Sequence, residues 1–316
     1  MASYPLKFSA FKLQIVLFSF FLIFSTISLS ATVTLRLRGQ LGNQFFQIAT
    51  AVALAQENQC NLYFPDFENV TDPRLKFVNL ETNYNALFYR IPNRISYAQP
   101  AFFYLEPDFR YRPIPYQPNI EICGYFESEK YFKKYRNLIV ELFAAPDDIE
   151  EDLARDFSSI IDHPNTVGIH VRTWYRDFKS DIRGSVFYNI MLPPDIEYYK
   201  KAIDLFDPNA LFVVFSDHIG WCKKQFKGID RNFIFIEGQD YLHDFYLLSK
   251  CKNVIVGSST FSWWAAYLNQ NPNKQIICRQ PFLSCLTQED PKDILCDGWI
   301  PIYMPNIAPI PIFDED

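Results

Sequence analysis

The sequence has 316 residues, more than one hydrophobic core usually supports, so we expect two domains. Hydrophobic residues make up 49% of the chain, which is enough to build a core in each domain. The formal net charge of −6 argues against the positive surface with which nucleic-acid-binding proteins neutralise phosphates, so we expect no nucleic-acid partner. A charged small ligand would have to be bound by a few well-placed cations.

The first distinctive segment is apolar. Residues 13–35 carry no charge and are preceded by lysines. About 20 such residues can span a bilayer, and lysines on their N-terminal side place residues 1–12 in the cytosol. We therefore expect residues 13–31 to form a transmembrane signal anchor, so that the folded part enters the secretory pathway. The alternative is a cleaved signal peptide, because residues 28–31 supply the small side chains of a cleavage site.

A strand, a glycine turn and a helix are predicted next. Residues 32–37 alternate like a strand, Gly42 lies in the turn, and residues 45–56 form an alanine-rich helix. This order is typical of the start of a βαβ unit. The amides of Asn43 and Gln44 could bind sugar hydroxyls at the start of the helix, although an asparagine there is commonly a simple helix cap.

The region from residue 57 to residue 165 is rich in proline and aromatic residues. Its patterns predict strands at 60–64 and 121–125 and an amphipathic helix at 129–143. The irregular aromatic segments between them could stack on sugar rings, or could equally be loops held by apolar anchors. Asn69 begins an N-V-T sequon and is the predicted N-glycosylation site.

A polar segment that contains a proline, residues 162–165, is the predicted domain boundary. It separates an N-terminal α/β domain at residues 32–165 from a C-terminal α/β domain at residues 166–316. Strands alternate with helical stretches in the second domain, and they are predicted at 166–171, 211–215, 233–236, 253–256 and 275–278. This alternation is typical of a parallel sheet covered by helices.

Polar side chains stand where these strands end. The residues are His170 and Arg172 after the first strand, Asp217 after the second, Glu237 after the third, and 258–260 after the fourth. The ends of parallel strands converge on one crevice, so these side chains are expected to lie together. Because arginine can bind phosphate through two parallel hydrogen bonds, a nucleotide with a diphosphate fits this edge.

The stretch from Asp244 to Leu268 changes its pattern three times. It predicts a helix, a buried strand, a loop of small hydroxylated residues and a second, aromatic helix. The hydroxyls of Ser259 and Thr260 and the free N–H groups of the second helix could bind an anion together. A short run of such residues is more often only a helix cap.

Three segments together carry a family resemblance: GQLGNQFFQIATAVALA, GIHVR and CKNVIVGSSTFSWWAAYL. They resemble the α-1,2-fucosyltransferases of glycosyltransferase family 11. The resemblance implies a GT-B-like α/β fold of two Rossmann-like domains, with GDP-fucose bound in the C-terminal domain and the acceptor facing the N-terminal one. It also implies transfer of L-fucose, with inversion, to the 2-hydroxyl of a galactose-like residue on a glycan. No metal or other cofactor is expected, and the location implied is a single-pass type II Golgi membrane protein.

The resemblance also implies roles for individual residues. Arg172 would hold the β-phosphate and stabilise the leaving group, and Asn43 is also expected to be catalytic. Asp177 is our candidate for the base, although this carboxylate near cations could equally be an ion-pair partner. The resemblance also implies that Arg172, Asp244, Thr260 and Phe261 bind the donor. Together with the strand-end residues His170 and Asp217 and the loop residue Ser259, the predicted donor-binding residues are His170, Arg172, Asp217, Asp244, Ser259, Thr260 and Phe261. Those facing the sugar are Gly42, Asn43 and Gln44.

One position departs from the family pattern, because Thr173 stands where a second arginine is usual. A small insertion would let Arg176 and Asp177 take over that role. Two alternatives therefore stay open, a catalytically silent, membrane-anchored binder of glycans or nucleotides, and a fucosyltransferase with another acceptor or linkage. A shared fold does not decide between them.

Overall fold

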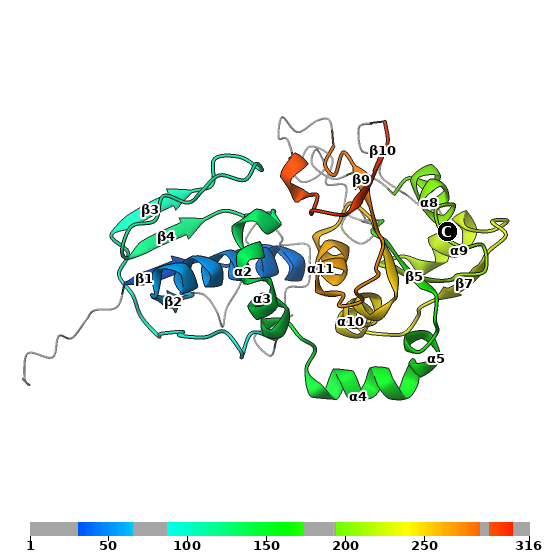
Figure 1. Cartoon of the computed structure of the whole chain (residues 1–316), viewed down its shortest axis with the longest axis horizontal. Helices are drawn as coiled ribbons and strands as arrows, with labels where there is room; N and C mark the ends of the chain where they lie inside the picture. Colours follow the sequence, from blue (N-terminus) through cyan, green and yellow to red (C-terminus); the bar gives the residue numbers. More distant parts are fainter. Residues whose placement is uncertain (1–30, 66–86, 174–191, 193, 285–290, 306–316) are drawn as a thin grey trace, which may run out of the picture.

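The computed structural model describes residues 31–65, 87–173, 192, 194–284 and 291–305. Two parallel sheets with their own helices lie side by side, which confirms the predicted α/β class (Figure 1). Residues 13–30 of the predicted anchor and the sequon at Asn69 lie outside the described residues. No helix in the described ranges combines the length and the apolar character needed to cross a bilayer.

The first sheet has four parallel strands in the spatial order β2, β1, β4, β3. They are β1 (Thr32–Leu35), β2 (Asn61–Tyr63), β3 (Phe102–Leu105) and β4 (Ile120–Cys123). β1 is buried along its length because it pairs with a strand on either side and contacts α2 (Leu41–Asn58). β3 is an edge strand that exposes Phe102, Phe103 and Leu105, so no alternation of buried and exposed residues marks it in the sequence.

α2 is the central helix of the first lobe. Its sequence is rich in alanine, which has the highest helix propensity. It begins after Gln40, whose backbone is extended, and ends at Gln59, whose φ of 52° is left-handed. Most residues of its first three turns are buried, as expected for a helix covered on nearly all sides rather than on one face.

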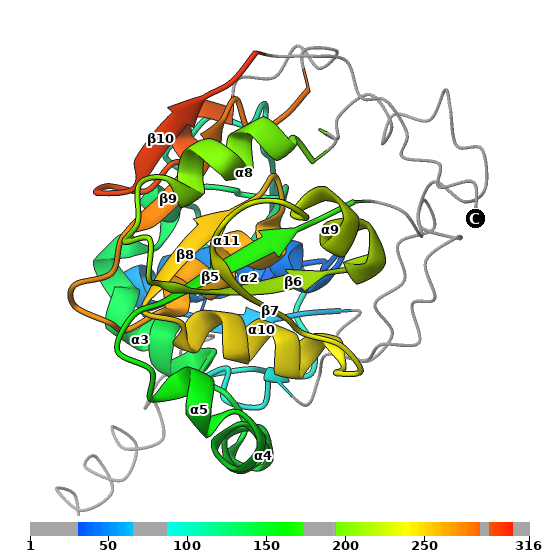
Figure 2. The same ribbon diagram turned by 90° about the vertical axis from the view of Figure 1, so that its right-hand side faces the viewer.

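The second sheet has six parallel strands in the order β10, β9, β8, β5, β6, β7 (Figure 2). They are β5 (Thr166–Val171), β6 (Leu211–Ser216), β7 (Asn232–Phe235), β8 (Asn253–Val256), β9 (Ile276–Gln280) and β10 (Ile300–Tyr303). The helical elements around them are α8 (Ile196–Ile203), α9 (Ile219–Gln225), α10 (Tyr241–Lys250), α11 (Thr260–Leu268) and the 3-10 helix η5 (Pro291–Ile294). The five strands predicted here are confirmed within one or two residues of their bounds.

The strand order of this sheet defines a ligand-binding position. From β5 the chain runs outward through β6 and β7, then returns to β8 on the other side of β5 and continues outward through β9 and β10. β5 and β8 therefore flank the point where the winding reverses. Open parallel sheets bind their ligands in the crevice beyond the carboxyl ends of the strands at such a point.

Short helices connect the two sheets. They are η3 (Glu129–Tyr131), η4 (Lys133–Tyr135), α3 (Arg136–Leu142), α4 (Asp147–Asp156) and α5 (Ser158–Ile161). The single helix predicted at 129–143 is wrong, because the backbone of Phe132, with φ of −139°, interrupts it. The ring of Phe132 is fully buried and stacks on Trp264 of the second lobe, with 5.3 Å between ring centroids. Packing between the lobes thus overrides the helical pattern.

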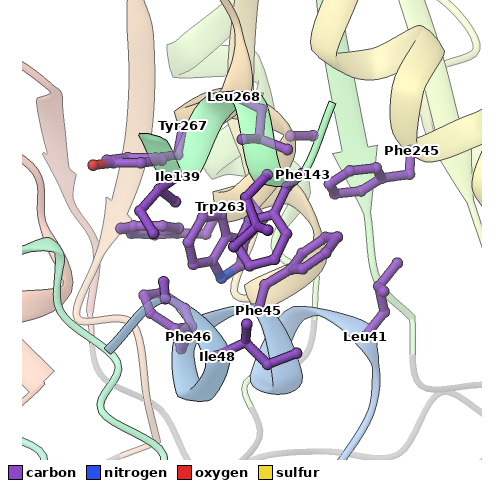
Figure 3. Packing of buried hydrophobic residues seen from close by; sticks show 14 of the residues in the cluster. Leu41, Phe45, Phe46, Ile48, Ile139, Phe143, Phe245, Trp263, Tyr267 and Leu268 are labelled. Atoms are coloured by element: carbon purple, nitrogen blue, oxygen red, sulfur yellow. The ribbon is translucent and has the colours of Figure 1, made fainter. Parts of the chain in front are cut away.

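The two lobes share one hydrophobic core, because α2 packs directly against α11 (Figure 3). The ring centroids of Phe46 and Trp263 are 4.3 Å apart, and those of Phe45 and Trp264 are 5.4 Å apart. All four side chains are fully buried. Large buried aromatic rings dominate core energetics, so this contact fixes the relative position of the lobes.

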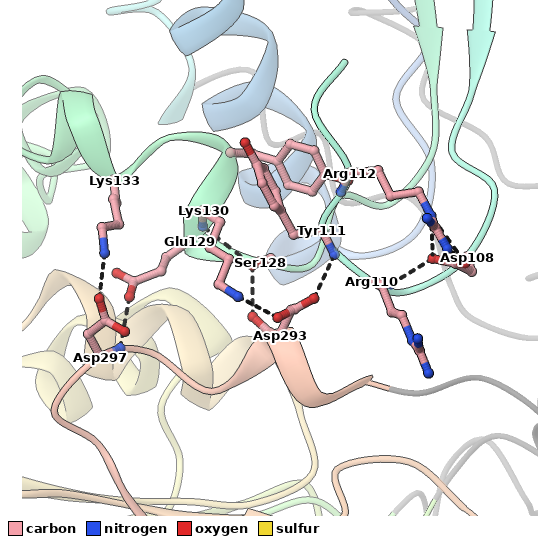
Figure 4. A network of polar contacts seen from close by, with 11 residues as sticks. Asp108, Arg110, Tyr111, Arg112, Ser128, Glu129, Lys130, Lys133, Asp293 and Asp297 are labelled. Atoms are coloured by element: carbon pink, nitrogen blue, oxygen red, sulfur yellow. Dashed lines mark hydrogen bonds and ion pairs between the residues drawn. The ribbon is translucent and has the colours of Figure 1, made fainter. Parts of the chain in front are cut away.

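A second contact between the lobes is polar (Figure 4). The carboxylate of Asp293 in η5 accepts hydrogen bonds from the backbone N–H of Tyr111 at 2.9 Å and from the Lys130 ammonium at 2.5 Å. The hydroxyl of Ser128 donates to the carbonyl oxygen of Asp293 at 2.7 Å. Two segments of the first lobe, at Tyr111 and at residues 128–130, are therefore held on one residue of η5.

We expect Trp264→Ala to lower the free energy of unfolding by roughly 3–5 kcal/mol, the usual cost of truncating a buried aromatic residue. Chemical denaturation of the purified chain measures this loss. Trp299→Ala is the matched control, because Trp299 touches the same cluster through Trp263 but is only partly buried. Equal losses in the two variants would contradict the central role given to the α2–α11 contact.

Candidate functional site

The N-terminal ends of α2 and α11 meet between the two sheets. The Thr260 hydroxyl donates a hydrogen bond of 2.8 Å to the side-chain oxygen of Asn43. A Cβ atom added to Gly42 would lie only 2.6 Å from the Thr260 hydroxyl oxygen, so this approach requires a glycine. The glycine turn and the hydroxylated loop, far apart in the sequence, therefore form one site.

Asn43 and Gln44 have different surroundings. Asn43 is not a helix cap, because α2 begins at Leu41 and its N-cap residue is Gln40. Gln44 is only 1% exposed, and its side-chain amide donates to the carbonyl oxygen of Gly39 at 2.9 Å. Gln44 thus stabilises the glycine turn through this buried hydrogen bond, whereas Asn43 makes the contact with the second lobe.

His170, near the end of β5, connects that strand to the start of α11. Its ring is 6% exposed and stacks on the ring of Phe261, with 5.0 Å between centroids. Burial lowers the pKa of His170 to about 4, against the opposing effect of the Asp217 charge. The imidazole is therefore neutral at neutral pH and acts as a packed ring rather than as a cation.

Arg172 and Thr173 are both bound to Asp217. The Arg172 guanidinium donates to one carboxylate oxygen of Asp217 at 2.9 Å. The backbone N–H and the hydroxyl of Thr173 donate to the other oxygen, at 2.7 and 3.0 Å. Asp217, which the sequence assigned to donor binding, thereby orients Arg172. Thr173 is 1% exposed, so the residue that replaces the usual second arginine is a short side chain fitted against this carboxylate.

Ser259 and Thr260 lie at the start of α11. Ser259 is the N-cap residue, yet its hydroxyl makes no capping hydrogen bond. The interpretation of this loop as a helix cap is therefore confirmed for the position of Ser259 but not for a hydrogen bond from its hydroxyl. The first N–H groups of a helix have no partners within the helix and attract anions, so the start of α11 keeps this capacity.

Asp244 lies in the first turn of α10, beside the start of α11. Its neighbour Phe245 contacts the ring of Phe261, with 5.2 Å between centroids. Burial raises the pKa of Asp244 to about 7, and the charge of Asp240 adds to this rise. A carboxyl group with that pKa can donate or accept a hydrogen bond near neutral pH.

A buried cation near Arg172 was missed in the sequence. Arg279, in β9, is 2% exposed and lines a small pocket beyond the ends of β5, β8 and β9. The residues around this pocket are Arg172, Leu192, Pro194, Asp195, Tyr198, Tyr199, Gly257, Ser258 and Arg279. The sequence pattern could have identified it. Arg279 directly follows the strand predicted at 275–278, just as the other predicted polar residues stand at the ends of their strands.

Two carboxyl groups, the partly buried Glu106 and the buried Glu127, lie beyond the strands of the first sheet and were also missed. Glu106 follows β3 and accepts hydrogen bonds from the backbone N–H groups of Tyr125 and Phe126 at 2.7 and 2.9 Å. Burial raises the pKa of Glu106 to about 7 and that of Glu127 to about 8. In the described part of the chain, no group of three or more His, Cys, Asp or Glu side chains could hold a metal ion.

Asp177 and Asn69 lie outside the described residues, so their predicted roles as base and glycosylation site stay predictions. The other predicted site residues lie at the start of α2, at the ends of β5 and β6, and at the starts of α10 and α11.

We expect Gly42→Ala to destabilise the chain by about 1–3 kcal/mol, because the new methyl group would overlap the backbone and hydroxyl of Thr260. Gly220→Ala is the matched control, since a methyl group at Gly220 in α9 would meet no atom within 4 Å and alanine favours helices. Thermal unfolding of both variants tests this. A Gly42→Ala variant as stable as the wild type would show that the helix ends are not in close contact.

Several known proteins are similar to this chain. An α-1,2-colitosyltransferase of Escherichia coli is 30% identical over 272 residues, which are 75% of this chain and 87% of that protein. Galactoside α-(1,2)-fucosyltransferase 2 of Oryctolagus cuniculus is 28% identical over 246 residues, 74% of this chain and 66% of the relative. The crystal structure of fucosyltransferase NodZ from Bradyrhizobium matches with a TM-score of 0.50 at 16% identity, covering 75% of this chain and 93% of that one. This last likeness supports the GT-B-like fold alone.

These relatives correct the predicted location. A Golgi membrane protein was expected, yet the similar proteins include the colitosyltransferase and the O-antigen biosynthesis glycosyltransferase WbnK, both of Escherichia coli. Bacteria have no Golgi apparatus, so the resemblance does not imply that location. The expectation of a Golgi membrane location is therefore withdrawn.

The family resemblance itself is confirmed. A family model described as Glycosyl transferase family 11 matches residues 10–302, which include all three segments that carried the resemblance. The fold and the meeting of these segments at one site agree with this match. The chain belongs to glycosyl transferase family 11 and is a glycosyltransferase.

Proposed function

We propose that this chain transfers L-fucose from GDP-fucose to the 2-hydroxyl of a galactose-like residue on a glycan, with inversion at the anomeric carbon. The observation that carries the proposal is the convergence of three segments on one crevice. The start of α2, the end of β5 with Arg172, and the start of α11 meet at the switch point of the second sheet. The rabbit relative, a galactoside α-(1,2)-fucosyltransferase, supports the choice of linkage.

The site suits departure of a nucleoside diphosphate. Fucosyl transfer passes through a state in which the sugar carries positive charge and the leaving phosphate gains negative charge. Arg172, oriented by Asp217, can bind that phosphate, and the N–H groups at the start of α11, next to the pocket residue Ser258, would add to the attraction for an anion. Stabilising the leaving group in this way requires no metal ion.

The two lobes would divide the substrates between them. We assign the acceptor to residues 32–165 and GDP-fucose to residues 166–316, with Asn43 at their meeting point. Removal of the proton from the acceptor hydroxyl requires a base, and Asp177 remains our candidate for it. The acceptor-facing role proposed for Gly42, Asn43 and Gln44 rests on Asn43, which lies at the contact between the lobes, while Gly42 and Gln44 shape the turn that carries it.

The colitosyltransferase relative favours a second candidate donor. Colitose is fucose that lacks the 3-hydroxyl group, so the two sugars differ by one hydrogen-bonding group. A site that uses the 3-hydroxyl would reject the sugar without it, because its own polar groups would be left unpaired. The two donors must therefore be compared directly.

The proposal is tested by incubating the purified full chain with radiolabelled GDP-fucose and a panel of galactose-terminated acceptors in EDTA. We expect transfer to the 2-hydroxyl, undiminished by the chelator. GDP-colitose in a parallel reaction decides the donor. Binding of GDP-fucose without transfer or hydrolysis on any acceptor would instead favour the silent binder, and transfer to a different hydroxyl would correct the linkage.

We expect Arg172→Ala to abolish most turnover, because the leaving phosphate would lose its cation. Asp217→Asn should lower kcat about tenfold or more with a smaller change in KM, since it loosens Arg172 without removing it. Asp204→Asn is the matched control, because Asp204 pairs with Arg231 at 3.1 Å away from the site. Wild-type turnover in Arg172→Ala, or equal effects of the two aspartate variants, would exclude these roles.

A further inference from the structure

A small pocket beyond the ends of β5, β8 and β9 contains two guanidinium groups. Arg172 and Arg279 both line it, and their side chains are 17% and 2% exposed. The pocket lies where the winding of the sheet reverses, since β5 and β8 flank that point. Two cations at a ligand-binding position of a parallel sheet indicate a ligand with more than one negative charge.

Each of the two arginines lies near a carboxylate. Asp217 binds Arg172 at hydrogen-bonding distance, 2.9 Å. An oxygen of Asp195, which lines the pocket, lies 3.8 Å from Nη2 of Arg279. A buried guanidinium is further stabilised when an additional anion approaches it closely. Two guanidinium groups at one pocket therefore favour an anionic ligand there.

Neutral donors complete the pocket. The hydroxyl of Ser258 is buried and, within the described ranges, has no hydrogen-bond partner. Gly257 forms part of the pocket with its backbone, because a Cβ atom there would lie 2.8 Å from the His170 carbonyl oxygen. The hydroxyl of Tyr199 donates to that same carbonyl at 3.1 Å. Ser258 is thus the side chain whose hydroxyl is left for a ligand.

We propose that Arg279 is a second cation for the diphosphate of the sugar donor, acting with Arg172 and Ser258. The inference rests on the proposed function and deepens it, since it assigns the diphosphate to one pocket. The place in the chain where a second arginine was expected is occupied by Thr173, and Arg279 brings a second guanidinium to the pocket from β9 instead.

Calorimetric titration of the full chain with GDP, inorganic pyrophosphate and guanosine tests the inference. Arg279→Gln should weaken binding of GDP and pyrophosphate about tenfold or more and leave guanosine unchanged, because charge-assisted hydrogen bonds to phosphate are lost. Arg231→Gln is the matched control, since Arg231 pairs with Asp204 and does not line the pocket. Equal GDP affinity in Arg279→Gln and the wild type would overturn the inference.

Two further variants keep the test valid if Arg279→Gln does not fold. Ser258→Ala removes a single hydroxyl and should weaken pyrophosphate binding several-fold. Asp195→Asn leaves Arg279 in place but removes the competing carboxylate, so GDP should bind as tightly as in the wild type or more tightly. Unchanged pyrophosphate affinity in Ser258→Ala, or a tenfold loss of GDP affinity in Asp195→Asn, would contradict the assignment.

The outcomes also separate this inference from the proposed function. If the wild type transfers fucose while Arg279→Gln binds GDP normally, the inference alone fails. If the wild type binds GDP and pyrophosphate through Arg279 but transfers no sugar, the proposed function alone fails and the pocket stands as a nucleotide-binding site.

Discussion

The packing of α2 against α11 is the contact on which the rest of the structure depends. Along their lengths the two helices bring together fully buried aromatic rings, among them Phe46 and Trp263. At their starts the same two helices bring Asn43 to Thr260. One interface therefore stabilises the lobes and sets the geometry of the site. Gly42 is required at this interface because any side chain there would force the helix ends apart.

The charged side chains of the site form largely buried pairs, each of an arginine and an aspartate. Arg172 with Asp217, and Arg279 with Asp195, place each guanidinium near a carboxylate in surroundings of low dielectric constant. Such pairs contribute little to stability, because desolvation offsets their attraction. Their value lies in holding a cation ready at a fixed position, which is how preorganised sites stabilise charge in a transition state. The net charge of the whole chain, −6, gives no hint of this local arrangement.

Much of the second lobe could be predicted from sequence, because its central strands are short β-branched runs buried on both faces. The strands at 166–171 and 253–256 have the predicted bounds. The edge of the sheet that carries the site could also be predicted, because polar residues stand at the ends of those strands. What could not be predicted depends on tertiary packing, as the break at Phe132 does. β3 was missed because an edge strand with exposed apolar residues lacks alternation.

The roles of individual side chains were the least predictable part. The local sequence does not show that Asp217 accepts hydrogen bonds from Arg172 and Thr173, because these two residues lie 45 and 44 positions before it in the chain. The same holds for Arg279, whose neighbours in the pocket come from β5, α8 and the loop after β8. A strand-end rule identifies which residues reach the edge of a sheet, and only the packed structure shows which of them meet.

The shared aromatic core has a consequence for the catalytic cycle. Separating the lobes would expose Trp263 and Trp264 to water, at a cost of several kcal/mol for the apolar area involved. A hinge motion that separated the lobes would have to break this shared core. We therefore expect the lobes to stay packed together while the nucleotide enters and the product leaves.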